Sequence, residues 1–185
     1  MITIREENIG DVAVREALLD EAFGIERFEK TCERLREGRV PARGLALIAE
    51  LNGEVVGTVR LWHVKAGTVD DGLVLGPLAV SRACQSRGIG ASLMRAALNR
   101  AALAGYAAVL LVGDAPYYAR FGFSAGLADG LWLPGPVERD RFLALELQPN
   151  ALSMAWGLVK ATGELEDYRL ASSIPVPEKS IREAA

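Results

Sequence analysis

The sequence is poor in the residues that build metal and redox centres. It has a single histidine, His63, and only two cysteines, Cys32 and Cys84, in 185 residues. A site made of several histidines is therefore excluded, and the cysteines lack the spacing of a zinc or disulfide pair. A Ser-His-Asp triad is disfavoured as well, because no serine stands in a nucleophile-elbow motif. The sequence predicts no metal and two free thiols.

Long apolar runs and dense positive charge are also missing. No run reaches the roughly 18 to 20 residues that a membrane span needs, and residues 1–7 lack the basic start and apolar centre of a secretory signal. We expect a cytoplasmic protein without a membrane partner. The net charge is -3 with no basic stretch, which disfavours nucleic acid as a partner. A small-molecule or protein substrate fits better.

What remains is the composition of an ordinary globular protein. Half of the residues are hydrophobic and 24% are charged, and the length suits one domain. The clear patterns lie in residues 1–150, which we predict to be the folded domain. Residues 151–185 are weakly patterned and are expected to be a C-terminal extension, with a loosely packed tail at 172–185.

The chain is expected to open with a strand and two helices. Residues 1–6 alternate apolar and polar positions, as a half-buried strand does. Apolar residues at spacings of three and four predict a helix at 9–23 that ends at Gly24. A second helix is expected at 26–37.

An antiparallel meander should follow. Two strand-like runs, 45–49 and 55–62, flank Asn52-Gly53, which is the strongest short hairpin signal. A turn is expected at 70–72 and a third strand at 73–80.

The pattern then changes to strand, helix, strand. Residues 90–104 carry one apolar face and predict an amphipathic helix. The apolar run 107–112 is typical of a strand covered on both faces, and a crossover helix makes it parallel to strand 73–80. A short helix is expected at 116–121 and a late strand at 142–147. The predicted fold class is therefore three-layer α/β (α+β), a mixed sheet with an antiparallel N-terminal meander and a parallel pair, flanked by helices.

The loop before the amphipathic helix is rich in small residues. Residues 81–90 contain two glycines and two arginines, Arg82 and Arg87. Glycines let consecutive N–H groups turn inward as an anion-binding nest, and the helix N-terminus adds unpaired donors. The third glycine of a dinucleotide-binding G-x-G-x-x-G motif would fall at position 93, which is Leu93. No Gly-Lys-Ser/Thr follows, so a P-loop is absent as well. An ordinary strand-to-helix turn is the alternative reading of two glycines alone.

Two motifs give this loop a family context. Gln85, Gly88 and Gly90 match Gln/Arg-x-x-Gly-x-Gly/Ala, the acetyl-CoA motif of the GNAT (Gcn5-related N-acetyltransferase) superfamily, and residues 118–123 resemble its Tyr-x-x-x-Gly-Phe signature. Residues 75–123 are similar to the YhbS-type branch of predicted bacterial N-acetyltransferases. The resemblance covers about residues 1–150.

The resemblance implies an acetyl-CoA-dependent N-acetyltransferase in which acetyl-CoA is the cosubstrate and a primary amine of a small molecule or peptide attacks directly. In this fold the parallel strands splay apart to admit the pantetheine arm. Tyr118 would be the general acid that protonates the sulfur. The cofactor-binding residues implied are Leu78, Ala79, Val80, Gln85, Ser86, Arg87, Gly88, Ile89, Gly90, Ala91 and Tyr118.

The base that deprotonates the amine is not evident. No acidic residue falls within 73–80, so Asp114 is the nearest candidate, although it equally suits the cap of the helix at 116–121. His63 is more often structural in such a position, and Tyr117 is interpreted as packing. Trp62, Trp132 and Trp156 either pack or line the acceptor groove.

The sequence also bears on carbonyl activation, on an alternative function and on oligomeric state. A distortion in strand 75–80 would free N–H groups to polarise the acetyl carbonyl. The alternative function is a non-catalytic acyl-CoA-sensing module of the same fold, which the missing base favours. A homodimer is compatible with the sequence, and the acceptor is not specified by it.

Overall fold

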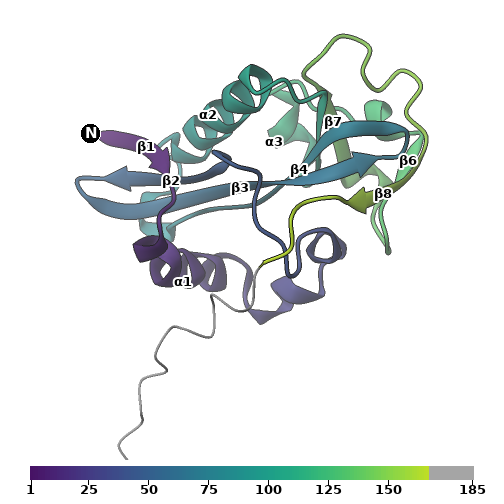
Figure 1. Cartoon of the computed structure of the whole chain (residues 1–185). Helices are drawn as coiled ribbons and strands as arrows, with labels where there is room; N and C mark the ends of the chain where they lie inside the picture. Colours follow the sequence, from purple (N-terminus) through teal and green to yellow (C-terminus); the bar gives the residue numbers. More distant parts are fainter. Residues whose placement is uncertain (167–185) are drawn as a thin grey trace, which may run out of the picture.

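The computed structural model describes residues 1–166, which form a mixed sheet with helices on both faces (Figure 1). Helix α2 covers one face, and α1 with the short helices that follow it covers the other. The strands are β1 (Ile2–Glu6), β2 (Ala46–Leu51), β3 (Glu54–Ala66), β4 (Val69–Val80), β5 (Ala108–Val112), β6 (Leu131–Trp132), β7 (Phe142–Glu146) and β8 (Gly157–Ala161). The α-helices are α1 (Val12–Phe23), α2 (Ile89–Leu103) and α3 (Ala115–Ala119). The 3-10 helices are η1 (Ile9–Asp11), η2 (Ile25–Glu29), η3 (Thr31–Leu35), η4 (Arg82–Cys84), η5 (Gly126–Ala128) and η6 (Arg139–Arg141).

The main sheet has the order β1-β2-β3-β4-β5-β7. Its neighbours are antiparallel except for β4 and β5. The predicted hairpin is confirmed: Asn52 and Gly53 join β2 to β3 with φ values of 53° and 87°, as a type I′ turn requires. The predicted mixed sheet with an N-terminal meander is therefore present.

The parallel pair separates after a short ladder. Residues 72–74 of β4 pair with residues 108–110 of β5, and no later residue of either strand pairs with the other. Strand β4 nevertheless continues to Val80. The splayed arrangement expected from the sequence is confirmed, and from Leu75 onward the edge of β4 that faces β5 has no strand partner among residues 1–166.

Two sequence predictions about local structure are wrong. The expected helix at 26–37 is two 3-10 helices, η2 and η3, because Lys30 between them is extended (φ −67°, ψ 140°). The expected turn at 70–72 lies inside β4, and the chain reverses instead before Val69, where Gly67 has φ 59°.

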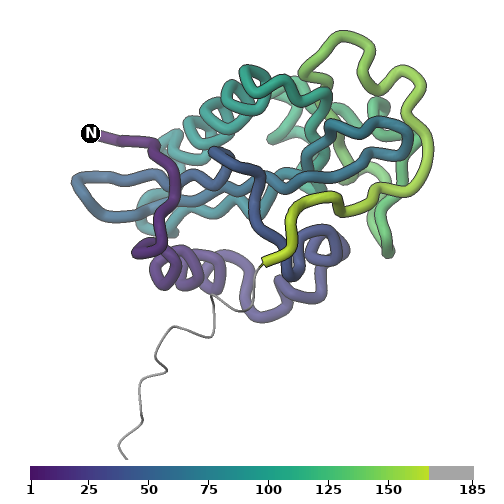
Figure 2. The backbone as a smooth tube through the Cα atoms, viewed as in Figure 1, coloured from purple at the N-terminus to yellow at the C-terminus, as the bar shows by residue number. Residues whose placement is uncertain are grey.

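The segment after residue 150 contains a strand that the pattern did not indicate. Strand β8 pairs with the end of β3 and with β6. Its continuation lies beside residues 38–40, where Val40 N–H donates to the Glu164 carbonyl at 3.0 Å (Figure 2). Residues 157–161 thus share the sheet with the rest of the chain. The tail expected at 172–185 lies outside the described residues.

Helix α2 packs against β3 and β4 on one face of the sheet. Its residues Ile89, Leu93, Met94, Ala97 and Ala101 are almost fully buried. The Cδ1 atom of Leu93 lies 3.1 Å from the position that a Cβ would take on Gly57 of β3, so helix and sheet are in close contact there.

Because of this contact, Leu93→Ala should lower the free energy of unfolding by about 2 to 5 kcal/mol, the usual cost of a buried leucine cavity. Urea unfolding followed by circular dichroism measures it. Leu103, in the same helix but 89% exposed, is the control, and Leu103→Ala should cost less than about 0.5 kcal/mol. Equal losses in the two variants would contradict the packing described.

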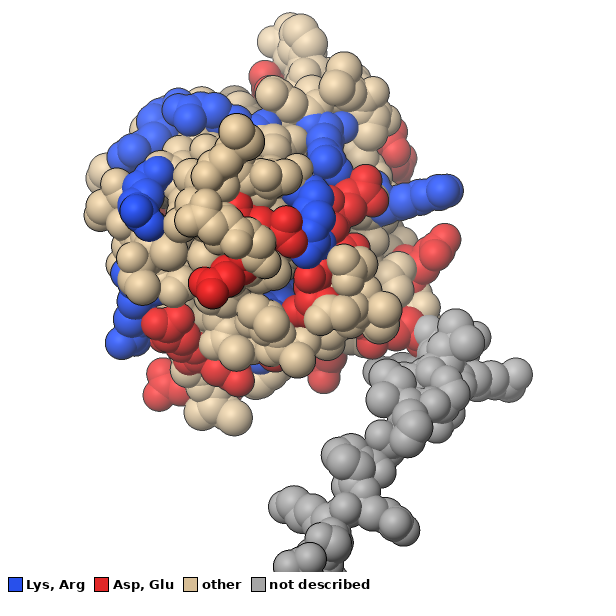
Figure 3. Space-filling view, turned by 90° about the vertical axis from the view of Figure 1, so that its left-hand side faces the viewer, with Lys and Arg blue, Asp and Glu red and all other residues tan. Residues whose placement is uncertain are grey.

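Charges of both signs are mixed on the face shown in Figure 3, with Lys and Arg more frequent along its upper margin. Within residues 1–166, no helix combines the length and the apolar character that crossing a bilayer requires.

Candidate active site

The loop that precedes α2 has the backbone of an anion nest. Ser86 (φ 62°) and Gly88 (φ 78°) both adopt left-handed conformations, and a non-glycine residue in this region is uncommon enough to suggest function. Gly88 is the N-cap of α2, and no side chain caps the helix there. A Cβ built on Gly88 would meet no atom within 4 Å, so the loop leaves open space for a ligand.

The first turn of α2 supplies backbone N–H donors to this nest. Ser92 N–H bonds to the Gly88 carbonyl at 3.0 Å, so the N–H groups of Ile89, Gly90 and Ala91 precede the first helical bond and have no partner within the helix. The hydroxyl of Tyr117 in α3 lies 3.2 Å from the Cβ position of Gly90. The sequence interpretation gave Tyr117 a packing role only, and its hydroxyl in fact reaches the nest.

Strand β4 is distorted where it leaves β5. The register with β3 shifts between Val59 and Leu61, so that Gly76 and Pro77 together lie opposite Arg60, which is the pattern of a β-bulge. Gly76 has φ 132°, a conformation that favours glycine. Its carbonyl accepts a hydrogen bond from Trp62 Nε1 at 2.7 Å. The expected distortion in strand 75–80 is confirmed.

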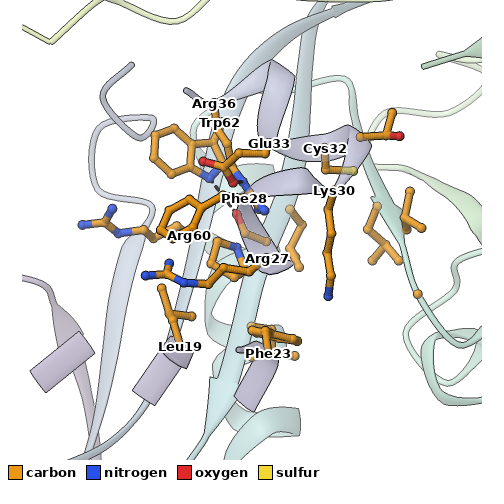
Figure 4. A pocket seen from close by; sticks show the side chains of 18 of the residues that line it. Leu19, Phe23, Arg27, Phe28, Lys30, Cys32, Glu33, Arg36, Arg60 and Trp62 are labelled. Carbon is orange, nitrogen blue, oxygen red and sulfur yellow. Dashed lines mark hydrogen bonds and ion pairs between the residues drawn. The ribbon is translucent and has the colours of Figure 1, made fainter. Parts of the chain in front are cut away.

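A cavity of about 1280 Å³ opens over this bulge. One wall comes from residues 75–78 of β4 and from residues 111–114 at the end of β5 and just after it, where the strands splay. A second wall comes from α1, η2 and η3. Figure 4 shows this second wall, with Phe23, Phe28, Lys30 and Glu33 projecting into the cavity. Of the predicted cofactor-binding residues, Leu78 and Tyr118 line it, whereas residues 85–91 lie beyond it at the start of α2.

Tyr118 is held on three sides. Its ring packs edge-on against Tyr117 (4.9 Å between centroids) and Phe123 (5.9 Å), and Cε2 lies 2.2 Å from where a Cβ of Gly113 would be. Gly113 therefore makes room for the ring. The hydroxyl makes no hydrogen bond with residues 1–166 and is not fully buried, so it faces the cavity.

The environment keeps Tyr118 protonated. Burial raises the pKa of Tyr118 to about 12, with smaller contributions from Tyr117 and Asp114. A hydroxyl with this pKa carries its proton throughout the neutral range and can donate it to a developing anion.

Asp114 lies at the end of β5 beside Tyr118. Its side chain is exposed and makes no capping hydrogen bond to α3, and the Asp114 carbonyl accepts from the N–H groups of Tyr117 and Tyr118. His63 lies outside the cavity, with Nε2 3.4 Å from the Tyr106 hydroxyl. Arg82 donates to the Glu21 carbonyl of α1 at 3.0 Å.

Sequence reasoning missed most of the cavity wall around η3. Trp62, Glu33 and Arg36 all line the cavity, but only Trp62 had been considered for the groove. The segment 25–36 carries no motif, and its 3-10 conformation hides the helical spacing that would show which side chains share a face. Trp132 and Trp156 instead pack on each other near the surface, with 4.9 Å between their ring centroids.

Comparison with known proteins agrees with this geometry. A family profile described as "Acetyltransferase (GNAT) domain" matches residues 42–125. The chain is 31% identical to the N-acetyltransferase YhbS of Escherichia coli, over 85% of this chain and 94% of that protein. It is also 31% identical to E. coli YjhQ, over 71% of this chain and 78% of that protein.

Solved structures give the same result. The crystal structure of E. coli YhbS in complex with CoA is 30% identical with a TM-score of 0.74, covering 87% of this chain and 89% of that one. A GNAT acetyltransferase from Brucella melitensis in complex with acetyl-CoA is 28% identical with a TM-score of 0.66, covering 88% of this chain and 96% of that one. The fold, the family profile and the relatives together show that this chain belongs to the GNAT family of N-acetyltransferases.

Proposed function

We propose that this enzyme binds acetyl-CoA and moves its acetyl group to a primary amine of a small molecule or peptide, with Tyr118 as general acid. The observation that carries the proposal is the Tyr118 hydroxyl, which opens into the same cavity as the splayed strands and lies one residue from a tyrosine that reaches the nest. Both structural relatives named above were crystallised with CoA or acetyl-CoA.

Residues of this chain fit the parts of the cosubstrate. The nest at residues 85–91 would hold the pyrophosphate by backbone N–H groups, which suits an anion at a helix N-terminus. The unpaired edge of β4 at residues 78–80 would pair with the pantetheine amides as a neighbouring strand does. Bound there, acetyl-CoA supplies an activated acetyl group as a thioester.

The reaction requires the protein to stabilise the carbonyl oxygen and to protonate the departing sulfur. As the amine attacks, negative charge develops on the carbonyl oxygen. Pro77 has no N–H, so the backbone donors at this bulge that would stabilise the charge are the N–H groups of its neighbours Gly76 and Leu78. Tyr118 then donates its proton to the departing sulfur. Burial, with smaller contributions from Tyr117 and Asp114, raises the pKa of that hydroxyl, so Tyr118 keeps the proton that an acid on this side of the cavity needs.

The first test is binding. Acetyl-CoA should raise the melting temperature of the purified protein, because a ligand that binds only the folded state stabilises it by about 2.7 kcal/mol at a hundredfold excess over Kd. For a protein of this size that corresponds to roughly 5 to 10 °C. Differential scanning fluorimetry measures the shift.

S-acetyl-N-acetylcysteamine, which has the thioester but no pyrophosphate, is the control ligand and should give almost no shift. No shift with millimolar acetyl-CoA would remove the cofactor assignment. Transfer is then assayed by release of free CoA thiol over primary amines, polyamines, amino acids and peptides. A protein that binds acetyl-CoA and acetylates none of them would be a sensing module.

A further inference from the structure

The proposed reaction needs a group that takes a proton from the incoming amine. A primary amine is mostly an ammonium ion at neutral pH and cannot attack until it is deprotonated. The acid and the base act on different atoms, sulfur and nitrogen, so the two groups should stand on different walls of the cavity. Tyr118 and Asp114 share the wall formed by β5 and α3. The base is therefore sought on the wall formed by α1, η2 and η3.

Most carboxylates around the cavity are poorly placed to be a base. Glu29, Glu37, Glu138 and Glu166 are exposed to solvent, where water competes for any ammonium ion. Glu16 is more enclosed, but both of its oxygens are held, one by Arg15 and the other by Arg27. Burial acts to raise the pKa of Glu16, and the hydrogen bonds from the two arginines outweigh it and lower that pKa.

Glu33 of η3 differs from these residues. Its side chain is 22% exposed, and Oε2 accepts a hydrogen bond from Arg36 Nε at 2.7 Å. The other oxygen, Oε1, has no hydrogen-bond partner in residues 1–166 and is not fully buried. One oxygen is thus anchored and the other is open to the cavity.

Arg36 connects this carboxylate to the distorted strand. Its Nη1 atom lies 3.4 Å from the Cβ position of Gly76, the residue whose carbonyl is held by Trp62 Nε1. In Figure 4 the side chains of Glu33, Arg36 and Trp62 group at one wall of the cavity. The anchored carboxylate therefore stands on the wall that contains η3, and Arg36 lies between it and the bulge of β4.

We propose that Glu33 is the catalytic base for the acceptor amine, a role that rests on the proposed function. Oε1 accepts a hydrogen bond from the ammonium group and takes one proton from it. The nitrogen lone pair then forms the N–C bond while the C–S bond breaks, and the sulfur receives the proton of Tyr118. The second proton on nitrogen leaves as the neutral amide forms and, through water, restores the Tyr118 hydroxyl, and Glu33 releases its own proton to solvent. Arg36 is a positioning residue that fixes the carboxylate.

The test is the pH profile of Glu33→Gln, a variant that keeps an acceptor for Arg36. With an acceptor amine from the screen, kcat/KM should fall about 10²-fold at pH 7.5, within the usual range for a general base. The loss should shrink to less than about tenfold near pH 9.5, because the amine then deprotonates in solution. Acetyl-CoA affinity by calorimetry should not change.

A second measurement needs no turnover. With CoA in place of acetyl-CoA, the acceptor amine should bind Glu33→Gln about tenfold more weakly than wild type, as the loss of a hydrogen bond to a charged group implies. Glu37→Gln, an exposed carboxylate of the same cavity, is the matched control and should behave as wild type in both measurements.

Three results would overturn the assignment. One is a Glu33→Gln variant with the wild-type pH profile and amine affinity. Another is a loss of activity that is constant from pH 7.5 to 9.5, which would mean a structural role. The third is the pH-dependent loss appearing in Asp114→Asn and not in Glu33→Gln. If wild type acetylates no amine, the proposed function fails first and this assignment fails with it.

Discussion

Tyr118→Phe should lower kcat by about 10²- to 10⁴-fold while leaving the Kd for acetyl-CoA nearly unchanged. The ring keeps its contacts with Tyr117, Phe123 and Gly113, so the variant removes only the hydroxyl. That hydroxyl matters once negative charge develops on sulfur, and an interaction made only in the transition state affects kcat rather than binding. Steady-state kinetics with a thiol-release assay measure kcat, and calorimetry measures the Kd.

Two other tyrosines make the experiment specific. Tyr106→Phe removes a hydroxyl that lies beside His63 and outside the cavity, so it should leave kcat unchanged. Tyr117→Phe removes the hydroxyl next to Gly90 and should weaken acetyl-CoA binding more than it lowers kcat. Wild-type turnover in Tyr118→Phe would leave Tyr118 as a packing residue.

The pH dependence follows from the same hydroxyl. Because burial raises the pKa of Tyr118 to about 12, the acid stays protonated at neutral pH and is lost only as the pH rises toward that value. We therefore expect no decline of kcat from Tyr118 between pH 7 and about pH 10. A decline near pH 8 that Tyr118→Phe abolishes would contradict this.

The parts of the fold that sequence predicts well are those fixed by local chemistry. Asn52-Gly53 specifies its turn through left-handed conformations that few residues adopt. The apolar face of α2 specifies which side meets the sheet. The loop at residues 85–90 could be interpreted as a nest because its glycines and the helix start occur together with the second motif at residues 118–123.

The parts that sequence missed depend on distant contacts. Strand β8 is held by β3 and β6, far away in the chain, and has no strong pattern of its own. The helix expected at 26–37 breaks at Lys30, whose side chain packs over the Phe23 ring at 4.5 Å. Glu33 has no motif around it, and only the folded chain brings its partner Arg36 to Gly76. Propensity alone does not specify such tertiary arrangements.

Gly88→Glu should raise the Kd for acetyl-CoA by about 10³-fold and abolish the thermal shift. The new side chain would enter space that is empty for 4 Å around the Cβ position, which is where we place the pyrophosphate. Two unit charges about 4 Å apart repel by roughly 4 kcal/mol at an effective dielectric constant of 20, and each 1.4 kcal/mol is about tenfold in Kd. Calorimetry with acetyl-CoA measures the change.

The variant also strains the backbone, and Gly105→Glu separates this effect from the loss of binding. Gly105 lies just past the other end of α2 with φ 86°, and a Cβ there also meets nothing within 4 Å. Both substitutions place a side chain in a left-handed conformation, so both should lower the melting temperature of the ligand-free protein. Only Gly88→Glu should lose the acetyl-CoA shift, because only that end of the helix presents N–H donors to an anion. If both variants kept the wild-type shift, the pyrophosphate would bind elsewhere; if both lost it, the effect would be strain and not charge.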